Sequence, residues 1–157
     1  MLFEADNDLN DASRQLGLSP PYNLEDYVRA RAPLENVLWS VSEGVQLISG
    51  TGRIDDLSEL KGSLRRRLVE GIHRLESVFD YLLVDCGSGQ NEIQLQLIRA
   101  APFVVLVVTD EHQSQREGLM LLQQLKALGL GRPVMLVVNQ TTGGTAAQAC
   151  FQRLDKA

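Results

Sequence analysis

The sequence predicts an α/β protein, a three-layer fold in which a mostly parallel sheet carries helices on both faces. The order of its elements leads to this class. Short apolar runs such as Tyr81–Val84 and Phe103–Val108 alternate with longer segments in which apolar residues recur at helical spacing. A length of 157 residues suits one domain with a sizeable core.

The first half of the chain divides into short elements separated by turn residues. Gly17 is expected to end the first helix, because glycine tolerates the left-handed conformation found just after many helices. Asn23 is placed to cap the second helix, with Asp26 three residues further on. Strands are predicted over 1–5 and 45–48, and helices over 9–16, 23–28, 34–38 and 58–76.

The second half repeats the alternation with a clearer period. Leu119, Leu122 and Leu125 place one apolar face on the helix that ends before Gly129. Strands are predicted over 81–84, 103–108 and 134–138, and helices over 93–98, 114–128 and 145–154. Because helices separate these strands, the sheet should be parallel with right-handed crossovers, and ligands should bind at the carboxyl ends of its strands.

Composition narrows the function classes. A net charge of -5 argues against a broad nucleic-acid surface, and Arg65-Arg66-Arg67 is interpreted as a solvated helix face. Cys86 and Cys150 have neither metal-ligand spacing nor the density of a disulfide scaffold. The apolar runs are too short to span a bilayer, and Met1-Leu2-Phe3-Glu4 does not resemble a signal peptide. A reducing cytoplasm is the expected compartment.

The stretch around Asp85 carries the strongest chemical signal. The run Tyr81–Val84 ends at this acid, and small residues, Gly87, Ser88 and Gly89, follow it. A carboxylate at a strand end can hold Mg²⁺ through water, and glycines allow a backbone to approach a phosphate closely. A tight turn capped by Asp85 explains the same residues equally well.

Four loops at the expected carboxyl edge carry candidate groups. They contain Glu4 and Asp6, then Asp85 with Gly87 and Gly89, then Thr109 and Asp110, and finally Asn139. Taken in order, the segments resemble the MinD/ParA family of ATPases, and within it the flagellar-number regulators of the FlhG/FleN type. Glu4-Ala5-Asp6-Asn7-Asp8-Leu9 is similar to switch I, and Asp85-Cys86-Gly87-Ser88-Gly89 to the Walker B strand end and switch II. The segments 23–28, 34–38 and 44–50 resemble the parts of the family between these motifs.

The resemblance implies a role for each candidate residue. Asp6 would orient the attacking water, and Asp85 would hold Mg²⁺ through water, with Glu4 as a second acid at the metal. Ser88 and Gly89 would sense the γ-phosphate through backbone N–H groups, and Asn139 would read the adenine. Each has a simpler alternative: Asp6 or Asp8 as a helix cap, Asp85 as a turn acid, and Asn139 as a loop cap.

The departures from the family pattern affect the predicted activity. No Gly-x-x-x-x-Gly-Lys-Ser/Thr motif occurs in the sequence, so the phosphate cradle and its lysines are missing. We expect one domain over 1–157 that lacks the family's first strand, its P-loop and its C-terminal end. Gly87 stands where the family often has Pro or Ala, and Gln140 where MinD-like members often have Arg. ATP and Mg²⁺ are implied for the intact family, but this chain alone is expected to bind neither and to be inactive.

Three functions remain to be compared. The first is a partial ATPase core that regulates flagellar number or placement, or a related positioning process. The second is a non-catalytic, degenerate relative that keeps partner surfaces. A receiver-type phospho-acceptor is disfavoured, because the run Val134–Val138 ends in Asn139 and not in a lysine. The resemblance implies a homodimer or a protein partner, peripheral membrane association in the intact family, and no direct contact with nucleic acid.

Overall fold

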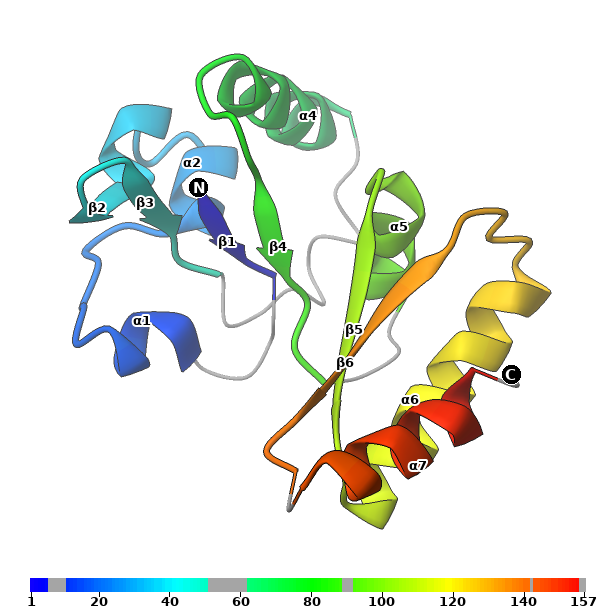
Figure 1. The fold of residues 1–157 in the computed structure, drawn as a ribbon. Helices are drawn as coiled ribbons and strands as arrows, with labels where there is room; N and C mark the ends of the chain where they lie inside the picture. Colours follow the sequence, from blue (N-terminus) through cyan, green and yellow to red (C-terminus); the bar gives the residue numbers. More distant parts are fainter. Residues whose placement is uncertain (6–10, 51–61, 89–91, 142, 156–157) are drawn as a thin grey trace. The chain divides into compact units, whose positions relative to one another are not determined.

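The computed structural model describes residues 1–5, 11–50, 62–88, 92–141 and 143–155 (Figure 1). The chain divides into two compact units, Met1–Leu97 and Ile98–Ala157, and each is described by itself. The first unit contains a four-stranded sheet, and the second contains a two-stranded sheet. The α/β class and the mostly parallel sheet predicted from the sequence are confirmed.

The sheet of the first unit has the order β2-β3-β1-β4. Its strands are β1 (Leu2–Glu4), β2 (Leu38–Ser42), β3 (Val45–Ile48) and β4 (Leu83–Asp85). β1 runs parallel to both β3 and β4, whereas β2 and β3 form an antiparallel hairpin. The hairpin turns at Gly44, which has a φ of 73° and therefore the conformation that glycine adopts most easily. The pairings bring the carboxyl ends of β1, β3 and β4 to one edge.

The helices of this unit are α1 (Asp11–Gln15), α2 (Leu24–Val28), the 3-10 helix η1 (Leu34–Val37), α4 (Ser63–Glu76) and most of α5 (Glu92–Ala100). Asn23 starts α2 as predicted, because its side chain accepts from the Asp26 N–H at 3.1 Å while the Asp26 carboxylate accepts from the Asn23 N–H at 3.1 Å. Such a capping box satisfies two N–H groups that the first helical turn leaves without partners.

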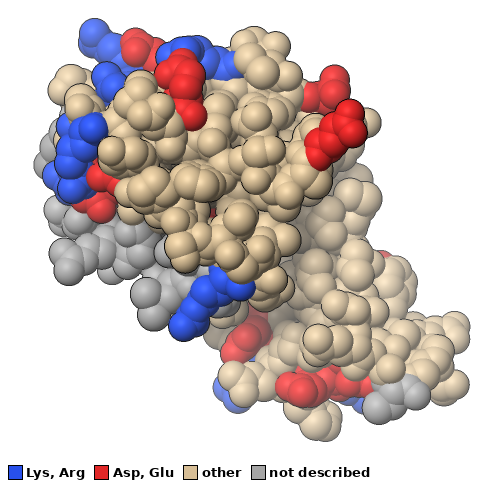
Figure 2. Space-filling view, turned by 90° about the vertical axis from the view of Figure 1, so that its left-hand side faces the viewer, with Lys and Arg blue, Asp and Glu red and all other residues tan. Residues whose placement is uncertain are grey.

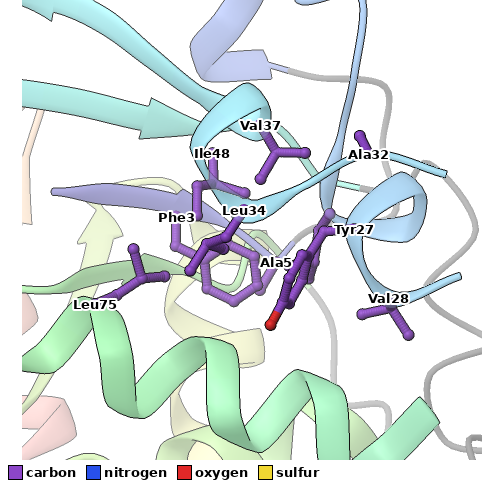
Figure 3. Packing of buried hydrophobic residues seen from close by; sticks show 10 residues of the cluster. Phe3, Ala5, Tyr27, Val28, Ala32, Leu34, Val37, Ile48 and Leu75 are labelled. Carbon is purple, nitrogen blue, oxygen red and sulfur yellow. The ribbon is translucent and has the colours of Figure 1, made fainter. Parts of the chain in front are cut away.

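Buried side chains from β1, α2, η1, β3 and α4 form the core of the first unit (Figure 3). Phe3 of β1 lies among Leu34, Ile48 and Leu75, so the sheet and the helices close around the same cluster. Tyr27 joins α2 to α4, since its hydroxyl donates to the Arg67 carbonyl at 3.1 Å and its own carbonyl accepts from Arg67 Nε at 2.7 Å.

The second unit contains β5 (Val104–Thr109), β6 (Val134–Asn139), α6 (His112–Ala127) and α7 (Gly144–Leu154). β5 and β6 are parallel and in register from Val104–Val134 to Thr109–Asn139. Alternate strand residues pack with both helices around Val108, Cys150 and Leu154. The described helices therefore cover one face of this sheet.

The other face of the β5–β6 sheet is apolar and exposed. Val105, Val107, Met135 and Val137 keep 52%, 57%, 52% and 44% of their surface accessible. Strands that are apolar at every position are typical of sheets buried on both faces. The sequence expectation of helices on both faces is thus met by only one layer of helices among the described residues of this unit.

The strand pairing differs from a single continuous sheet. Among the described residues, the edge strands are β2 and β4 in the first sheet and β5 and β6 in the second. β2 was not predicted from the sequence.

Within the described residues, no helix is both long enough and apolar enough to cross a membrane.

Basic and acidic side chains are interspersed on the surface drawn in Figure 2. In the first unit, Arg29 pairs with Glu25 at 2.7 Å and Arg74 with Glu35 at 2.6 Å. The pKa of Glu35 is lowered, first by a hydrogen bond from its own backbone and then by the hydrogen bond from Arg74. The surface seen in this view therefore offers mixed charge and not a continuous basic patch.

Candidate functional site

The carboxyl ends of β1 and β4 form the centre of the candidate site. Glu4 and Asp85 are register partners, and the Ala5 N–H donates to the Asp85 carbonyl at 2.7 Å. The parallel pairing of β1 with β4 thus places the switch I-like and Walker B-like acids on neighbouring strands. Asp6, the predicted water-orienting residue, lies outside the described residues.

Asp85 is exposed and begins a tight turn. Its Oδ1 accepts a hydrogen bond from the Gly87 N–H at 3.0 Å, and Gly87 has a φ of 60°. The turn interpretation is therefore correct in geometry. It leaves the magnesium interpretation open, because an exposed carboxylate at a strand end can also hold a hydrated cation. Among the described residues, no group of three or more His, Cys, Asp or Glu side chains is arranged to hold a metal ion.

The segment after Asp85 is held from α5. The Gln94 amide, which is buried, donates to the carbonyl of Cys86. Ser88, predicted to contact a γ-phosphate, is exposed just beyond this anchor, and Gly89 lies outside the described residues. Sequence reasoning missed Gln94, although its spacing from Leu97 and Ile98 put it on the apolar face of a predicted helix.

Glu4 has a different environment from Asp85. It is only 3% exposed, and its carboxylate accepts from the Ser13 N–H and the Ser13 hydroxyl, each at 2.8 Å. A third donor, the Gly50 N–H, lies 3.4 Å from Oε2. These contacts satisfy a carboxylate that burial would otherwise penalise.

Asn139 lies in the second unit, at the carboxyl end of β6 and opposite Thr109 of β5. Its Oδ1 accepts from the Gln140 N–H at 2.9 Å, and Gln140 has a φ of 50°. Asn139 is exposed, so its amide remains accessible at the strand end. The loop-cap interpretation describes this local geometry, and the adenine-reading role stays a prediction.

Thr109 and the start of α6 form a small network beside Asn139. The Thr109 N–H donates to Ser114 Oγ at 2.9 Å, and the Cys150 thiol lies 3.8 Å from the Thr109 carbonyl. Burial raises the pKa of the Cys150 thiol, and the charge of Asp110 adds to this effect while Arg153 opposes it. Cys150 is therefore a buried packing residue that holds α7 against the end of β5.

Comparison with solved structures identifies the class of fold. The ParA family ATPase of Chlorobium tepidum matches 98% of this chain and 68% of its own with a TM-score of 0.71 and 18% identity. A chain of the MinC:MinD cell division protein complex of Aquifex aeolicus matches 97% of this chain and 58% of its own, at a TM-score of 0.69 and 21% identity. Cobyrinic acid a,c-diamide synthase of Mycobacterium smegmatis, solved with an ATP analog and magnesium, gives 0.69 and 15% over 99% of this chain and 69% of its own. The fold is that of the MinD/ParA-type ATPases.

A sequence relative points to one branch of this class. The antiactivator FleN of Pseudomonas aeruginosa is 29% identical over 125 residues, which are 80% of this chain and 45% of FleN. No family model matches the chain. The resemblance to MinD/ParA-type proteins close to FleN is thereby confirmed, and the chain spans less than half of FleN's length.

Proposed function

We propose that this chain is the part of a MinD-like ATPase core that carries the switch I and Walker B acids, acting in the regulation of flagellar number or placement or a related positioning process. The observation that carries the proposal is the pairing of Glu4 with Asp85 at one sheet edge, in a chain similar to FleN. In such sheets ligands bind at the carboxyl ends of the strands.

The roles of Asp85, Ser88 and Asn139 are supported by their exposed positions at strand ends or in the turn after β4, and the roles of Asp6 and Gly89 follow the family resemblance. Asp85, exposed at the end of β4, holds Mg²⁺ through water, and Mg²⁺ bound there neutralises phosphate charge. Asp6 orients the attacking water, Ser88 and Gly89 receive the γ-phosphate on backbone N–H groups, and Asn139 hydrogen-bonds the adenine. The relatives solved with ATP analogs support ATP as the nucleotide of the completed protein.

A further segment with a strand and a P-loop completes this domain. Its absence from the sequence is plain, since no Gly-x-x-x-x-Gly-Lys-Ser/Thr motif occurs. The bare apolar face of the β5–β6 sheet supports the same conclusion. An in-frame P-loop upstream of Met1 in the genome would provide that segment.

The chain alone should not bind ATP at useful affinity. Charge-assisted hydrogen bonds contribute roughly 1.5–3 kcal/mol each. Losing several of them removes on the order of 5 kcal/mol of binding free energy, which weakens the affinity for ATP by at least roughly a thousandfold. Calorimetry with Mg-ATP tests this, and micromolar binding to the chain alone would contradict the assignment of a missing phosphate cradle.

Activity of the completed protein tests the site. Asp6→Ala should lower turnover while sparing ATP binding, because a water-orienting group acts mainly in the transition state. Asp85→Ala should in addition raise the Mg²⁺ concentration needed for half-maximal rate. Asp80→Ala, an exposed acid shortly before β4, is the matched control and should change neither quantity. Equal turnover of the wild type and Asp6→Ala would remove the role assigned to Asp6.

A second candidate is a non-catalytic interaction module. The exposed apolar face of the β5–β6 sheet favours it, because large bare apolar patches mark interaction surfaces. On this alternative a protein partner or a second copy covers the face, and the membrane contacts of the intact family are not needed. A stop codon in place of an upstream P-loop would favour the module, and an in-frame P-loop would favour the ATPase.

A further inference from the structure

We propose that Glu4 is a positioning residue: its carboxylate, at the start of the switch I-like segment, holds α1 against the end of β1 and ties both to the loop after β3. The metal contact that the family resemblance implies for an acid at this place is thereby left to Asp85. The catalytic consequence rests on the proposed ATPase function, whereas the structural contacts do not.

Glu4 and Ser13 are joined by two hydrogen bonds. Glu4 ends β1, Ser13 lies in α1, and the residues between them in the sequence include Asp6. Ser13 donates twice to the same carboxylate, from its N–H to Oε1 and from its hydroxyl to Oε2, each at 2.8 Å. Two bonds between one pair of residues fix direction as well as distance, so α1 is held at a defined place relative to β1.

The Glu4 carboxylate and its partner Ser13 are both buried. Glu4 is 3% exposed and Ser13 is 1% exposed, and the Gly50 N–H adds a third donor to Oε2 at 3.4 Å. A carboxylate whose two oxygens already accept hydrogen bonds, and which solvent barely reaches, has little room for a hydrated cation. Asp85 has the opposite character, because it is exposed at the end of the neighbouring strand.

The length of the Glu4 side chain allows it to reach donors on two different segments. Glu reaches one methylene further than Asp, about 1.5 Å along the chain of carbons. At the end of β1 this length lets the carboxylate meet donors from both α1 and the loop after β3. The length of the Glu4 side chain therefore fits the positions of the Ser13 and Gly50 donors.

The test uses the full-length protein and four variants: Glu4→Gln, Glu4→Asp, Ser13→Ala, and Glu43→Gln as an exposed acidic control. Hydrogen exchange of the Ser13 and Gly50 amides is measured beside ATP turnover and its Mg²⁺ dependence. Glu4→Gln and Glu4→Asp should speed exchange of the Ser13 amide roughly tenfold to a hundredfold, because a charge-assisted bond is lost. Turnover should fall in Glu4→Gln and Ser13→Ala, with the half-saturating Mg²⁺ concentration unchanged within about twofold.

The double variant Glu4→Gln/Ser13→Ala distinguishes a coupled pair from two separate residues. Its effect on the exchange rate of the Gly50 amide should be smaller than the product of the two single effects. The reason is that both changes affect the hydrogen bond between the Ser13 hydroxyl and the Glu4 side chain. A tenfold rise in the Mg²⁺ requirement of Glu4→Gln, with Ser13→Ala unchanged, would overturn the proposal and make Glu4 a metal ligand. If Glu4→Gln fails to fold, Ser13→Ala alone decides, because unchanged exchange and unchanged turnover in that variant would also overturn it.

The exchange measurement separates this inference from the proposed function. Absence of ATPase activity in the full-length wild type would end the proposed function but leave the amide protection to be compared. Unprotected Ser13 and Gly50 amides in the active wild type would end the Glu4 inference and leave the ATPase proposal intact.

Discussion

The buried polar residues of the first unit gather around one end of its sheet. Glu4 and Ser13 bind each other at the end of β1, Gln94 holds the segment after β4, and Ser49 follows β3. The residues assigned to ligand contact, Asp85 and Ser88, are exposed beside them. At the residue scale, the buried polar groups therefore shape the sheet edge at which Asp85 and Ser88 lie.

Removing the Gln94 anchor should destabilise the protein. Gln94→Ala leaves the Cys86 carbonyl without this donor, and a partly buried acceptor that loses its partner costs about 1–3 kcal/mol. Chemical denaturation measures the change in the free energy of unfolding. Gln123→Ala, at an exposed position of α6, is the control and should stay within about 0.5 kcal/mol of the wild type. A loss no larger than the control's would show that the bond does not hold the loop.

Cys150 should make stability depend on pH in the alkaline range. Burial raises the pKa of its thiol in the folded state above the ordinary value of 9.0. As pH rises, the unfolded chain loses the Cys150 proton before the folded chain does. The contribution of the buried thiol to the free energy of unfolding is therefore fully present below pH 9.0 and is lost as pH rises towards the folded-state pKa. The free energy of unfolding, measured from pH 8 to 10, should fall in the wild type and in Cys86→Ala. The slope should be shallower in Cys150→Ala, and identical slopes in all three proteins would contradict the assignment.

At the scale of elements, two close helix contacts require glycine, which has no side chain to separate the packed elements. A Cβ on Gly118 of α6 would lie 2.8 Å from Val108 Cγ1 of β5. A Cβ on Gly71 of α4 would lie 2.6 Å from the Tyr27 ring. Each glycine lets a helix approach the layer beneath it, which a larger residue would prevent.

Gly118→Ala tests this packing in the second unit. The added methyl should destabilise by about 1–3 kcal/mol through overpacking, which outweighs the roughly 1 kcal/mol that Ala gains over Gly in a helix. Gly131→Ala is the control, since a Cβ there meets nothing within 4 Å. Denaturant midpoints of the two variants give the comparison, and a net stabilisation by Gly118→Ala would mean that α6 moves away from β5 at little cost.

Local signals predicted the elements better than pairing signals did. Asn23 and Asp26 define the start of α2 within four residues, so the capping box was predictable. The β2 strand was missed, because its pairing with β3 depends on the turn at Gly44 more than on its own apolar content. Arg67 was interpreted as solvated, but its guanidinium lies 4.7 Å from the centre of the Tyr27 ring, and only the tertiary fold brings the two together.

The candidate site was predictable where it follows from strand order. The sequence placed Glu4 and Asp85 at the same edge of a parallel sheet, whereas their direct pairing came only from the structure. The role of Ser13 was not predicted, because a hydrogen bond between residues nine positions apart leaves no periodic pattern, whereas the position of Gln94 on an apolar helix face was a signal that was missed. Asp85 shows a further limit, since one turn geometry serves both a structural acid and a metal-binding acid.

At the scale of the whole molecule, the unpaired strand edges dominate the expected behaviour. β4 and β5 each present one edge without a partner among the described strands, and the β5–β6 sheet exposes an apolar face. Open edges are templates for pairing with other chains, and a domain is stable by only about 5–15 kcal/mol.

The chain expressed alone should therefore be oligomeric or poorly soluble. Sedimentation velocity over a range of concentrations measures this, with the protein that includes an upstream strand and P-loop as the comparison. The completed protein should sediment as a single well-defined species in the absence of nucleotide. A compact, concentration-independent monomer of the chain alone would contradict the open-edge interpretation and favour a rearranged sheet.

The exposed β5–β6 face also affects how this chain would evolve under laboratory selection. A screen for soluble expression of the chain alone would enrich polar residues at Val105, Val107, Met135 and Val137, because these positions carry its bare apolar surface. In the completed domain the same changes would place polar groups under a packed layer, where they cost stability. Fitness measured on the isolated chain and on the completed domain should thus be anticorrelated at these four positions, while it agrees at their buried neighbours Val104 and Val108.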